Sequence, residues 1–550
     1  MTDGVVSRAN YPHVPRRVVI LILCAIFFLG TTLRVGVMGE WHAHYQGDYA
    51  RDYLVARHIA FFHEFPLTGP DGAFGTLLPS PLYLYLWAPV VLLFDDVRAL
   101  AVANLFFQLA GIVLMFFIAR NIFGNAAALF ASAVWALSDA IVMQSAFPWQ
   151  PYEMEIALLV ALLFLVHAHV KKRLYYLAWA LIAFAVAISF HYSALGIAPV
   201  FLAVAALVAH EQRAPRRMYA IGSIIFVASL VLAHAPAMWY VISHGVFVEA
   251  IRPVIHSSGG SSILLIVQHF FQRIPIALGV LLGTNEARLL VSAGILVAFT
   301  VLYFLNSKRR FNLYMVSMLM GLVALHMFVS LLPDPGGQTA FPDRYYLPGL
   351  PLMVLLIAGS VEELVAYAGK FFRITIMCLA LIFVLLAAPT SMQWLLSYTR
   401  APLQMGQQQL IAPFSSNREY HPSIQAVESV IRSIKETKQF TNLHFFSMVG
   451  YRVYDAESVV RENYADEVFW APLEKLFDTK LVTLDDGTIR GWSSLGGDDY
   501  LFVWCFVANT SDERSACQKV FRADYPSYRI VQTVYETSPH AIYLATRTSL

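Results

Sequence analysis

The chain has 550 residues, of which 58% are hydrophobic and 13% are charged, and its mean hydropathy is +0.60. A soluble globular protein does not need so much apolar surface, so the composition excludes that class and predicts a polytopic α-helical membrane protein. The formal net charge of +2 gives no support for a nucleic-acid partner.

Apolar runs of about 20 residues predict where the chain crosses the membrane. The first run has no small-residue cleavage site, so we expect a span there and not a cleavable signal peptide. No internal repeat is evident, and an inverted-repeat transporter therefore gets no support. We expect about eleven spans, at residues 17–38, 98–119, 125–145, 152–170, 174–190, 192–209, 218–240, 288–305, 312–332, 345–365 and 374–396.

Lysine and arginine clusters at the span ends predict the orientation, because cytoplasmic loops carry an excess of both. An N-terminus inside the cell places all the clusters on the cytoplasmic side. A membrane domain at 1–396 would then have its loop 39–97 outside the cytoplasm, together with the tail 397–550. The six clusters are Arg16-Arg17, Arg120, Lys171–Arg173, Arg213–Arg217, Lys308–Arg310 and Lys370–Arg373.

Two apolar stretches are not counted as spans. A full span at residues 81–95 would invert every later loop, so we expect a short helix that dips into the outer leaflet. This helix would hold Tyr83, Tyr85 and Trp87 at interfacial depth. Three polar residues interrupt the stretch 261–283, for which we also expect an interfacial helix.

The tail 397–550 has a different composition from the rest of the chain. Short apolar runs such as 501–507 predict strands, and 423–438 predicts a helix. Strands and helices over about 150 residues predict a compact α/β domain. The sequence leaves open whether Cys505 and Cys517 pair in it, although a location outside the cytoplasm would allow a disulfide.

The stretch Gly47–Arg57 is unusually charged for this chain. On a helix, Asp48 and Asp52 share one face, and Arg51 lies beside both. Transfer of a group onto a hydroxyl needs a base that takes the proton, and a carboxylate at the membrane boundary suits this role. The alternative is that Asp48 only caps the helix, while Asp52 pairs with Arg51 or Arg57.

Four landmarks follow one another between residues 17 and 396. They are Gly47-Asp48-x-x-Arg51-Asp52, Pro-Leu-Tyr-Leu-Tyr at 81–85, His191-Tyr192-Ser193-Ala194-Leu195 and Asp343-Arg344-Tyr345-Tyr346-Leu347-Pro348. Their order and spacing resemble the C-type glycosyltransferase superfamily, and above all its bacterial branch of protein-mannosyltransferase-like and aminoarabinose-transferase-like enzymes. A C-terminal extracytoplasmic domain is also common in that superfamily.

The resemblance implies a sugar donor carried on a polyprenyl phosphate, with Asp48 as the catalytic residue. The family often has a second acid in the next outward loop, but the matching position here is Gln150. Glu153, just inside the following span, is the candidate second carboxylate, with Gln150 as a contact for a sugar hydroxyl. An acid at that depth is costly unless it faces a wet or protein-lined cavity.

A polyprenyl phosphate needs a cationic partner near the outer leaflet, and arginine suits a phosphate best. Arg344 is the leading candidate because it lies where a loop becomes a span, with Arg51, Arg252 and Arg273 as alternates. Interfacial anchoring is the alternative role for Arg344 and the tyrosines near it. The residues expected to line the substrate site are Arg51, Asp52, Gln150, Glu153, His191, Tyr192, Arg344 and Tyr345.

A metal ion is the alternative ligand of the loop, because Glu40, His42, His44 and Asp48 contain a His-x-His ligand spacing. The branch that the chain resembles does not need a metal, so we predict no metal and no other cofactor.

The sequence therefore predicts an inverting glycosyltransferase of the bacterial cytoplasmic (inner) membrane. It would transfer a sugar from a polyprenyl-phosphate donor to a hydroxyl of a glycolipid, polysaccharide or protein on the outer face. The alternatives are a transporter or flippase of a lipid-linked sugar, and a ligase that moves a whole glycan. A transporter should have charged or broken spans near mid-membrane, whereas the polar residues here gather toward one face.

Overall fold

The computed structural model describes residues 15–38, 48–69, 80–145, 148–244, 313–331, 343–367, 426–427, 429–430, 432–433, 446–453, 455–462, 483–485, 488–490, 500–506, 510–537 and 540–547. The chain forms two compact units. The helical unit comprises Met1–Gly39, Asp71–Tyr83 and Ala101–Leu410, and the second unit comprises Glu40–Pro70, Leu84–Leu100 and Ile411–Leu550.

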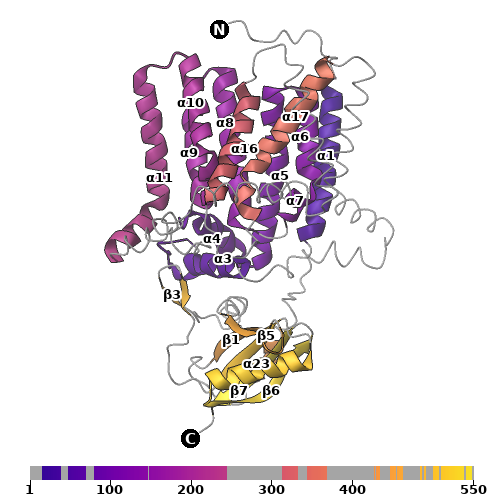
Figure 1. The fold of residues 1–550 in the computed structure, drawn as a ribbon, viewed down its shortest axis with the longest axis vertical. Helices are drawn as coiled ribbons and strands as arrows, with labels where there is room; N and C mark the ends of the chain where they lie inside the picture. Colours follow the sequence, from indigo (N-terminus) through magenta and orange to yellow (C-terminus); the bar gives the residue numbers. More distant parts are fainter. Residues whose placement is uncertain are drawn as a thin grey trace. The chain divides into compact units, whose positions relative to one another are not determined.

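Helices make up the described part of the chain up to residue 367 (Figure 1). In chain order they are α1 (Arg16–Met38), α3 (Asp48–Arg57), the π-helical turn η1 (His58–Phe62), α4 (Leu82–Phe94), α5 (Val97–Ile122), α6 (Asn125–Leu137), α7 (Asp139–Met143), α8 (Gln150–Lys171), α9 (Tyr175–Phe190), the 3-10 turn η2 (Tyr192–Ile197), α10 (Ala198–Glu211), α11 (Arg216–His244), α16 (Leu313–Leu331), the 3-10 turn η4 (Asp343–Tyr346) and α17 (Gly349–Tyr367).

Among the described residues, five helical segments are long and apolar enough to cross a membrane: α1, α5, α8, the continuous segment Tyr192–Glu211 and α11. Five shorter apolar helices accompany them. In the helical unit α9 packs between α8 and α11, and α6 packs between α1 and α17 (Figure 1). The predicted class of polytopic helical membrane protein is confirmed. The predicted spans 288–305 and 374–396 and the predicted helix 261–283 lie outside the described residues.

The predicted span 125–145 is not one continuous helix. It divides into α6 and the five-residue α7, with Ser138 in an extended conformation between them. Two buried charges from other helices satisfy the ends of α6. Arg34 of α1 donates to the carbonyl oxygens of Trp135 and Ala136, at 2.8 Å each.

The opposite end of α6 meets a carboxylate. Glu362 of α17 accepts a hydrogen bond from the backbone N–H of Ala127 at 2.7 Å. A helix has unpaired N–H groups at its start and unpaired carbonyls at its end, so an anion at the start and a cation at the end both stabilise it. Glu362 and Arg34 therefore explain why a helix of only thirteen residues is stable inside the helical unit.

The predicted short helix at 81–95 is α4, which has thirteen residues. Its length of about 20 Å is too short for a bilayer core of about 30 Å. Tyr83 and Trp87 are buried within the protein, at 1% and 0% exposure, and their expected interfacial depth stays a prediction. The exposed apolar residues of α4 are at its end, at Leu92, Leu93 and Phe94.

The C-terminal part contains the predicted strands. β1 (Phe446–Val453), β2 (Val459–Glu462), β5 (Tyr500–Phe506), β6 (Tyr528–Thr537) and β7 (His540–Arg547) form one sheet in the order β2-β1-β5-β7-β6. β1 and β5 are parallel, and the other pairs are antiparallel. β3 (Thr483–Asp485) and β4 (Thr488–Arg490) form a separate hairpin. The expected boundary at 396–397 lies outside the described residues and stays a prediction.

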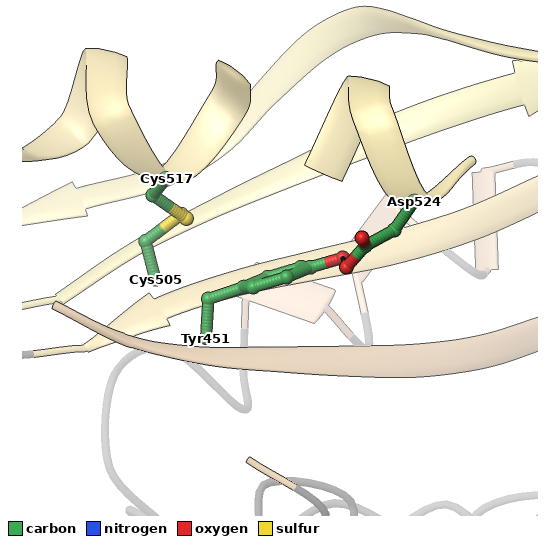
Figure 2. Close-up of a disulfide and its surroundings, with 4 residues drawn as sticks. All are labelled: Tyr451, Cys505, Cys517 and Asp524. Carbon is green, nitrogen blue, oxygen red and sulfur yellow. Dashed lines mark hydrogen bonds between the residues drawn. A yellow bond between two sulfur atoms is a disulfide. The ribbon is translucent and has the colours of Figure 1, made fainter. Parts of the chain in front are cut away.

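Helix α23 (Ser511–Asp524) lies against this sheet and begins with a capping box between Thr510 and Glu513. Its Cys517 forms a disulfide with Cys505 of β5, with the two Cα atoms 6.2 Å apart (Figure 2). At the end of α23, Asp524 accepts a hydrogen bond from the Tyr451 hydroxyl at 3.0 Å. The structure thus pairs the two cysteines whose pairing the sequence leaves open.

Candidate active site

Helix α3 begins at Asp48, the residue expected to be the base. The side chain of Asp48 is 38% exposed, and its Oδ1 lies 2.6 Å from Nη1 of Arg51. Asp52, one turn further on, has a fully buried side chain, and its Oδ1 lies 2.8 Å from Nη2 of Arg51. Arg51 therefore joins both carboxylates, as the helical spacing predicts, and Asp48 is the more accessible of the two.

Of the two arginines that could pair with Asp52, Arg51 does so, whereas Arg57 makes an ion pair with Asp95. Five residues along a helix correspond to about 500°, which turns Arg57 away from Asp52. The Nε of Arg57 instead donates to Oδ1 of Asp95 at 3.1 Å, and the Tyr53 hydroxyl lies 3.4 Å from the same oxygen. Asp95 was not among the expected site residues, although a charged residue after an apolar helix is a visible signal.

A further contact holds α3 to the start of α5. The Tyr49 hydroxyl donates to the carbonyl oxygen of Val97 at 2.7 Å. Tyr49 and Tyr53 are buried, so one side of α3 is fixed by Tyr49, Tyr53 and Arg57, while Asp48 stays accessible at its first turn. A carboxylate on a helix that is held on one side in this way keeps a defined orientation.

His191 and Tyr345 lie together in the helical unit, as expected for residues of one site. His191 precedes η2, and its Nδ1 lies 2.7 Å from the hydroxyl of Ser193. The imidazole faces the ring of Tyr345, with 5.3 Å between the ring centroids. Tyr345 is only 6% exposed, so its ring is packed inside the helical unit.

Two more histidines, which no motif in the sequence marks, also contact tyrosines. The ring of Tyr192 stacks on His234 of α11 at a centroid distance of 6.1 Å. The Tyr346 hydroxyl lies 3.1 Å from Nδ1 of His326 of α16. His234 and His326 lie inside apolar helices, where the sequence carries no signal that they meet tyrosines about 20 to 40 residues away.

The remaining expected residues lie in other positions. Gln150 is the first residue of α8, and Glu153 is 2% exposed. The Oε2 of Glu153 accepts from the backbone N–H of Trp149 at 3.2 Å, so this carboxylate also closes the first turn of α8. Arg344 lies in η4, but its side chain is outside the described residues.

Glu40, His42 and His44, the alternative metal ligands, also lie outside the described residues. In the part of the chain that the structure describes, no three histidine, cysteine or acidic residues are placed to hold a metal ion. Asp48, Arg51 and Asp52, which we call the α3 group, belong to the second unit. The histidines and tyrosines around His191 and Tyr345 belong to the helical unit.

No protein-family model matches this sequence, and no curated protein matches it. Solved structures do match. ArnT from Cupriavidus metallidurans bound to undecaprenyl phosphate superposes with a TM-score of 0.54 at 14% identity, covering 96% of this chain and 98% of that one. The apo state of ArnT matches at a TM-score of 0.52 and 13% identity, with the same coverage. The Archaeoglobus fulgidus oligosaccharyltransferase tethered with an acceptor peptide reaches only 0.47 at 12% identity, covering 96% of this chain and 74% of that one.

The chain is therefore a polytopic helical membrane protein with the fold of ArnT. Its fold is similar to that of ArnT over almost the full length of both chains. This confirms, at the level of the fold, the resemblance that the four sequence landmarks carry.

Proposed function

We propose that this protein is an inverting glycosyltransferase that uses a sugar carried on a polyprenyl phosphate. The observation that carries the proposal is an accessible carboxylate, Asp48, on a rigid helix within a chain that has the ArnT fold. The acceptor would be a hydroxyl group of a glycolipid, polysaccharide or protein on the outer face of the cytoplasmic membrane.

In the proposed reaction, Asp48 takes the proton of the acceptor hydroxyl while its oxygen attacks the anomeric carbon. The bond from that carbon to the phosphate oxygen breaks, and its electron pair leaves with the phosphate. Attack from the face opposite the phosphate inverts the configuration. The polyprenyl phosphate leaves as an anion, so the step needs no general acid, and binding supplies alignment.

The donor class is supported by the ArnT structure that contains undecaprenyl phosphate. We propose that Arg344 contacts the phosphate, beside Tyr345, His191 and Tyr192. Arg51 is the weaker phosphate candidate, because two carboxylates already occupy its guanidinium at 2.6 and 2.8 Å. Its proposed role is to orient Asp48, with Asp52 holding Arg51 in place.

The proposed substrate site also includes Gln150 and Glu153. Gln150 would contact a sugar hydroxyl from the first turn of α8. Glu153 would be the second carboxylate, although its bond to Trp149 shows that it also has a structural role.

We further propose that the C-terminal domain lies outside the cytoplasm. The disulfide between Cys505 and Cys517 supports this location, because disulfides persist in oxidising compartments and are rare in the cytosol. The positive-inside pattern of the basic clusters points to the same side.

A transporter is the less favoured alternative. The break between α6 and α7 is the kind of discontinuity that transporters use, since the free helix ends bind substrate or ions. Here the end of α6 at the break is already satisfied, because Arg34 donates to the carbonyl oxygens of Trp135 and Ala136. The broken helix is thereby explained by packing.

The test of the enzyme proposal is Asp48→Asn, which preserves size but removes the base. We expect turnover to fall by roughly 10²–10⁴-fold, while donor binding stays close to that of the wild type. The assay measures release of undecaprenyl phosphate from a panel of undecaprenyl-phosphate sugars, with purified protein in nanodiscs and a membrane extract as acceptor.

The matched control is Asp96→Asn. Asp96 is also a partly exposed carboxylate paired with an arginine, since its Oδ2 lies 2.7 Å from Nη2 of Arg98. We expect the control to retain activity. Near-normal transfer by a folded Asp48→Asn protein would remove Asp48 as the base, since asparagine caps a helix almost as well as aspartate.

A further inference from the structure

Five fully buried polar side chains of the helical unit lie on α5, on the segment after α7 and on α8. They are Asn104 and Gln108 of α5, Gln144 and Ser145 after α7, and Glu155 of α8, each at most 1% exposed. We call them the amide cluster. Polar side chains among membrane-spanning helices are costly, and they usually mark a site with a function.

Two hydrogen bonds connect three members of the amide cluster. The Nδ2 of Asn104 donates to the carbonyl oxygen of Gln144 at 3.0 Å. The side-chain Nε2 of Gln144 in turn donates to Oε1 of Glu155, also at 3.0 Å. The segment after α7 therefore lies between α5 and α8 and links them.

The helical repeat places Gln108 at the same interface. Asn104, Gln108 and Gly111 are separated by four and three residues, so they share one face of α5. Beyond Gln108 this face is in close contact with α6 and α8, because a Cβ added at Gly111 would lie 2.6 Å from Nε1 of Trp135 and 3.0 Å from Cδ1 of Ile156. Gln108 is thus between two points where α5 meets the Gln144 segment and the start of α8.

Several atoms of the amide cluster have no hydrogen-bond partner among the described residues. They are Oδ1 of Asn104, both amide atoms of Gln108, Oε1 of Gln144, Oγ of Ser145 and Oε2 of Glu155. Buried polar atoms in native proteins nearly always have a partner, so a concentration of exceptions indicates a missing ion or water.

The chemistry of the unpaired atoms in the amide cluster indicates which kind of ligand they would bind. Five of the six are oxygens, and among them the amide and carboxylate oxygens can only accept. Oxygen acceptors are the ligands of hard cations. When ionised, the carboxylate of Glu155 needs a compensating charge, because its described hydrogen bond is with the neutral amide of Gln144.

We propose that the amide cluster binds one monovalent cation between α5, the segment after α7 and α8, with sodium as the ion to test. One monovalent ion would neutralise the carboxylate of Glu155, which is the acid of the amide cluster. The bound ion would hold α5 and α8 together and fix the segment after α7.

The experiment compares thermal unfolding of the full-length protein in sodium chloride and in choline chloride, at equal ionic strength and pH. We expect sodium to raise the unfolding temperature saturably, by about 2–5 °C. Binding of ²²Na⁺ to the wild type measures the site directly. Glu155→Gln and, as a milder change, Gln108→Leu should abolish both the temperature shift and the ²²Na⁺ binding.

Ser360→Ala is the matched control, because Ser360 is equally buried but its hydroxyl bonds to the carbonyl oxygen of Leu356 in its own helix. This variant should keep the sodium response. Equal unfolding temperatures in sodium and choline, with no ²²Na⁺ bound, would overturn the proposal. Stabilisation by low pH alone, equal in both salts, would also overturn it and would place a proton on Glu155.

Discussion

Arg51 provides the most direct test of how the α3 group is built. Arg51→Ala removes a guanidinium that lies 2.6 Å from Asp48 and 2.8 Å from Asp52. The Asp48 carboxylate is 38% exposed, so losing its ion pair should cost at most about 1 kcal/mol. The Asp52 carboxylate is fully buried, and removing one partner of a buried ion pair costs about 3–5 kcal/mol. Because Arg51 itself is 13% exposed, we expect about 3 kcal/mol in total.

A double-mutant cycle separates the two carboxylates. Asp52→Asn added to Arg51→Ala should recover most of the lost stability, since it removes the buried charge that Arg51 compensates. Asp48→Asn in the same background should recover little. The assay is thermal unfolding of each purified variant in one detergent, at one protein concentration, and the coupling energy is the difference between the double mutant and the summed single mutants.

Two results would refute this reasoning. Equal recovery by Asp48→Asn and Asp52→Asn would show that burial does not distinguish the two carboxylates. Unchanged stability of Arg51→Ala, together with a loss of donor binding, would show that Arg51 binds the substrate phosphate and does not stabilise α3 through its ion pairs.

Two further predictions concern the fold. Arg34→Met should destabilise the protein by about 3 kcal/mol, because it leaves two buried carbonyls, of Trp135 and Ala136, without their charged donor; an unchanged unfolding temperature would contradict this role. Removing the disulfide by Cys505→Ala with Cys517→Ala should destabilise the C-terminal domain by about 2–3 kcal/mol, as measured by its protease resistance in the full chain. In intact spheroplasts, an impermeant maleimide should label these two cysteines only after reduction; labelling that also requires permeabilised membranes would place the domain in the cytoplasm.

The sequence by itself determined the features that depend on local regularities. An apolar run of about 20 residues has one favourable arrangement in a bilayer, a helix that satisfies its own backbone. The spans at 17–38, 98–119 and 152–170 therefore coincide with α1, α5 and α8. The contact of Arg51 with Asp48 was predictable for the same reason, because side chains three residues apart are neighbours on a helix surface.

Only the tertiary structure decided the contacts between distant segments. Arg57 selects Asp95, 38 residues away, because the helix turns it away from Asp52. Arg34 reaches α6 across 102 residues, and Glu362 reaches the other end of α6 across 235. Periodicity describes which face of a helix a residue occupies, but the partner depends on which helix packs against that face. The break at Ser138 and the amide cluster follow from that packing.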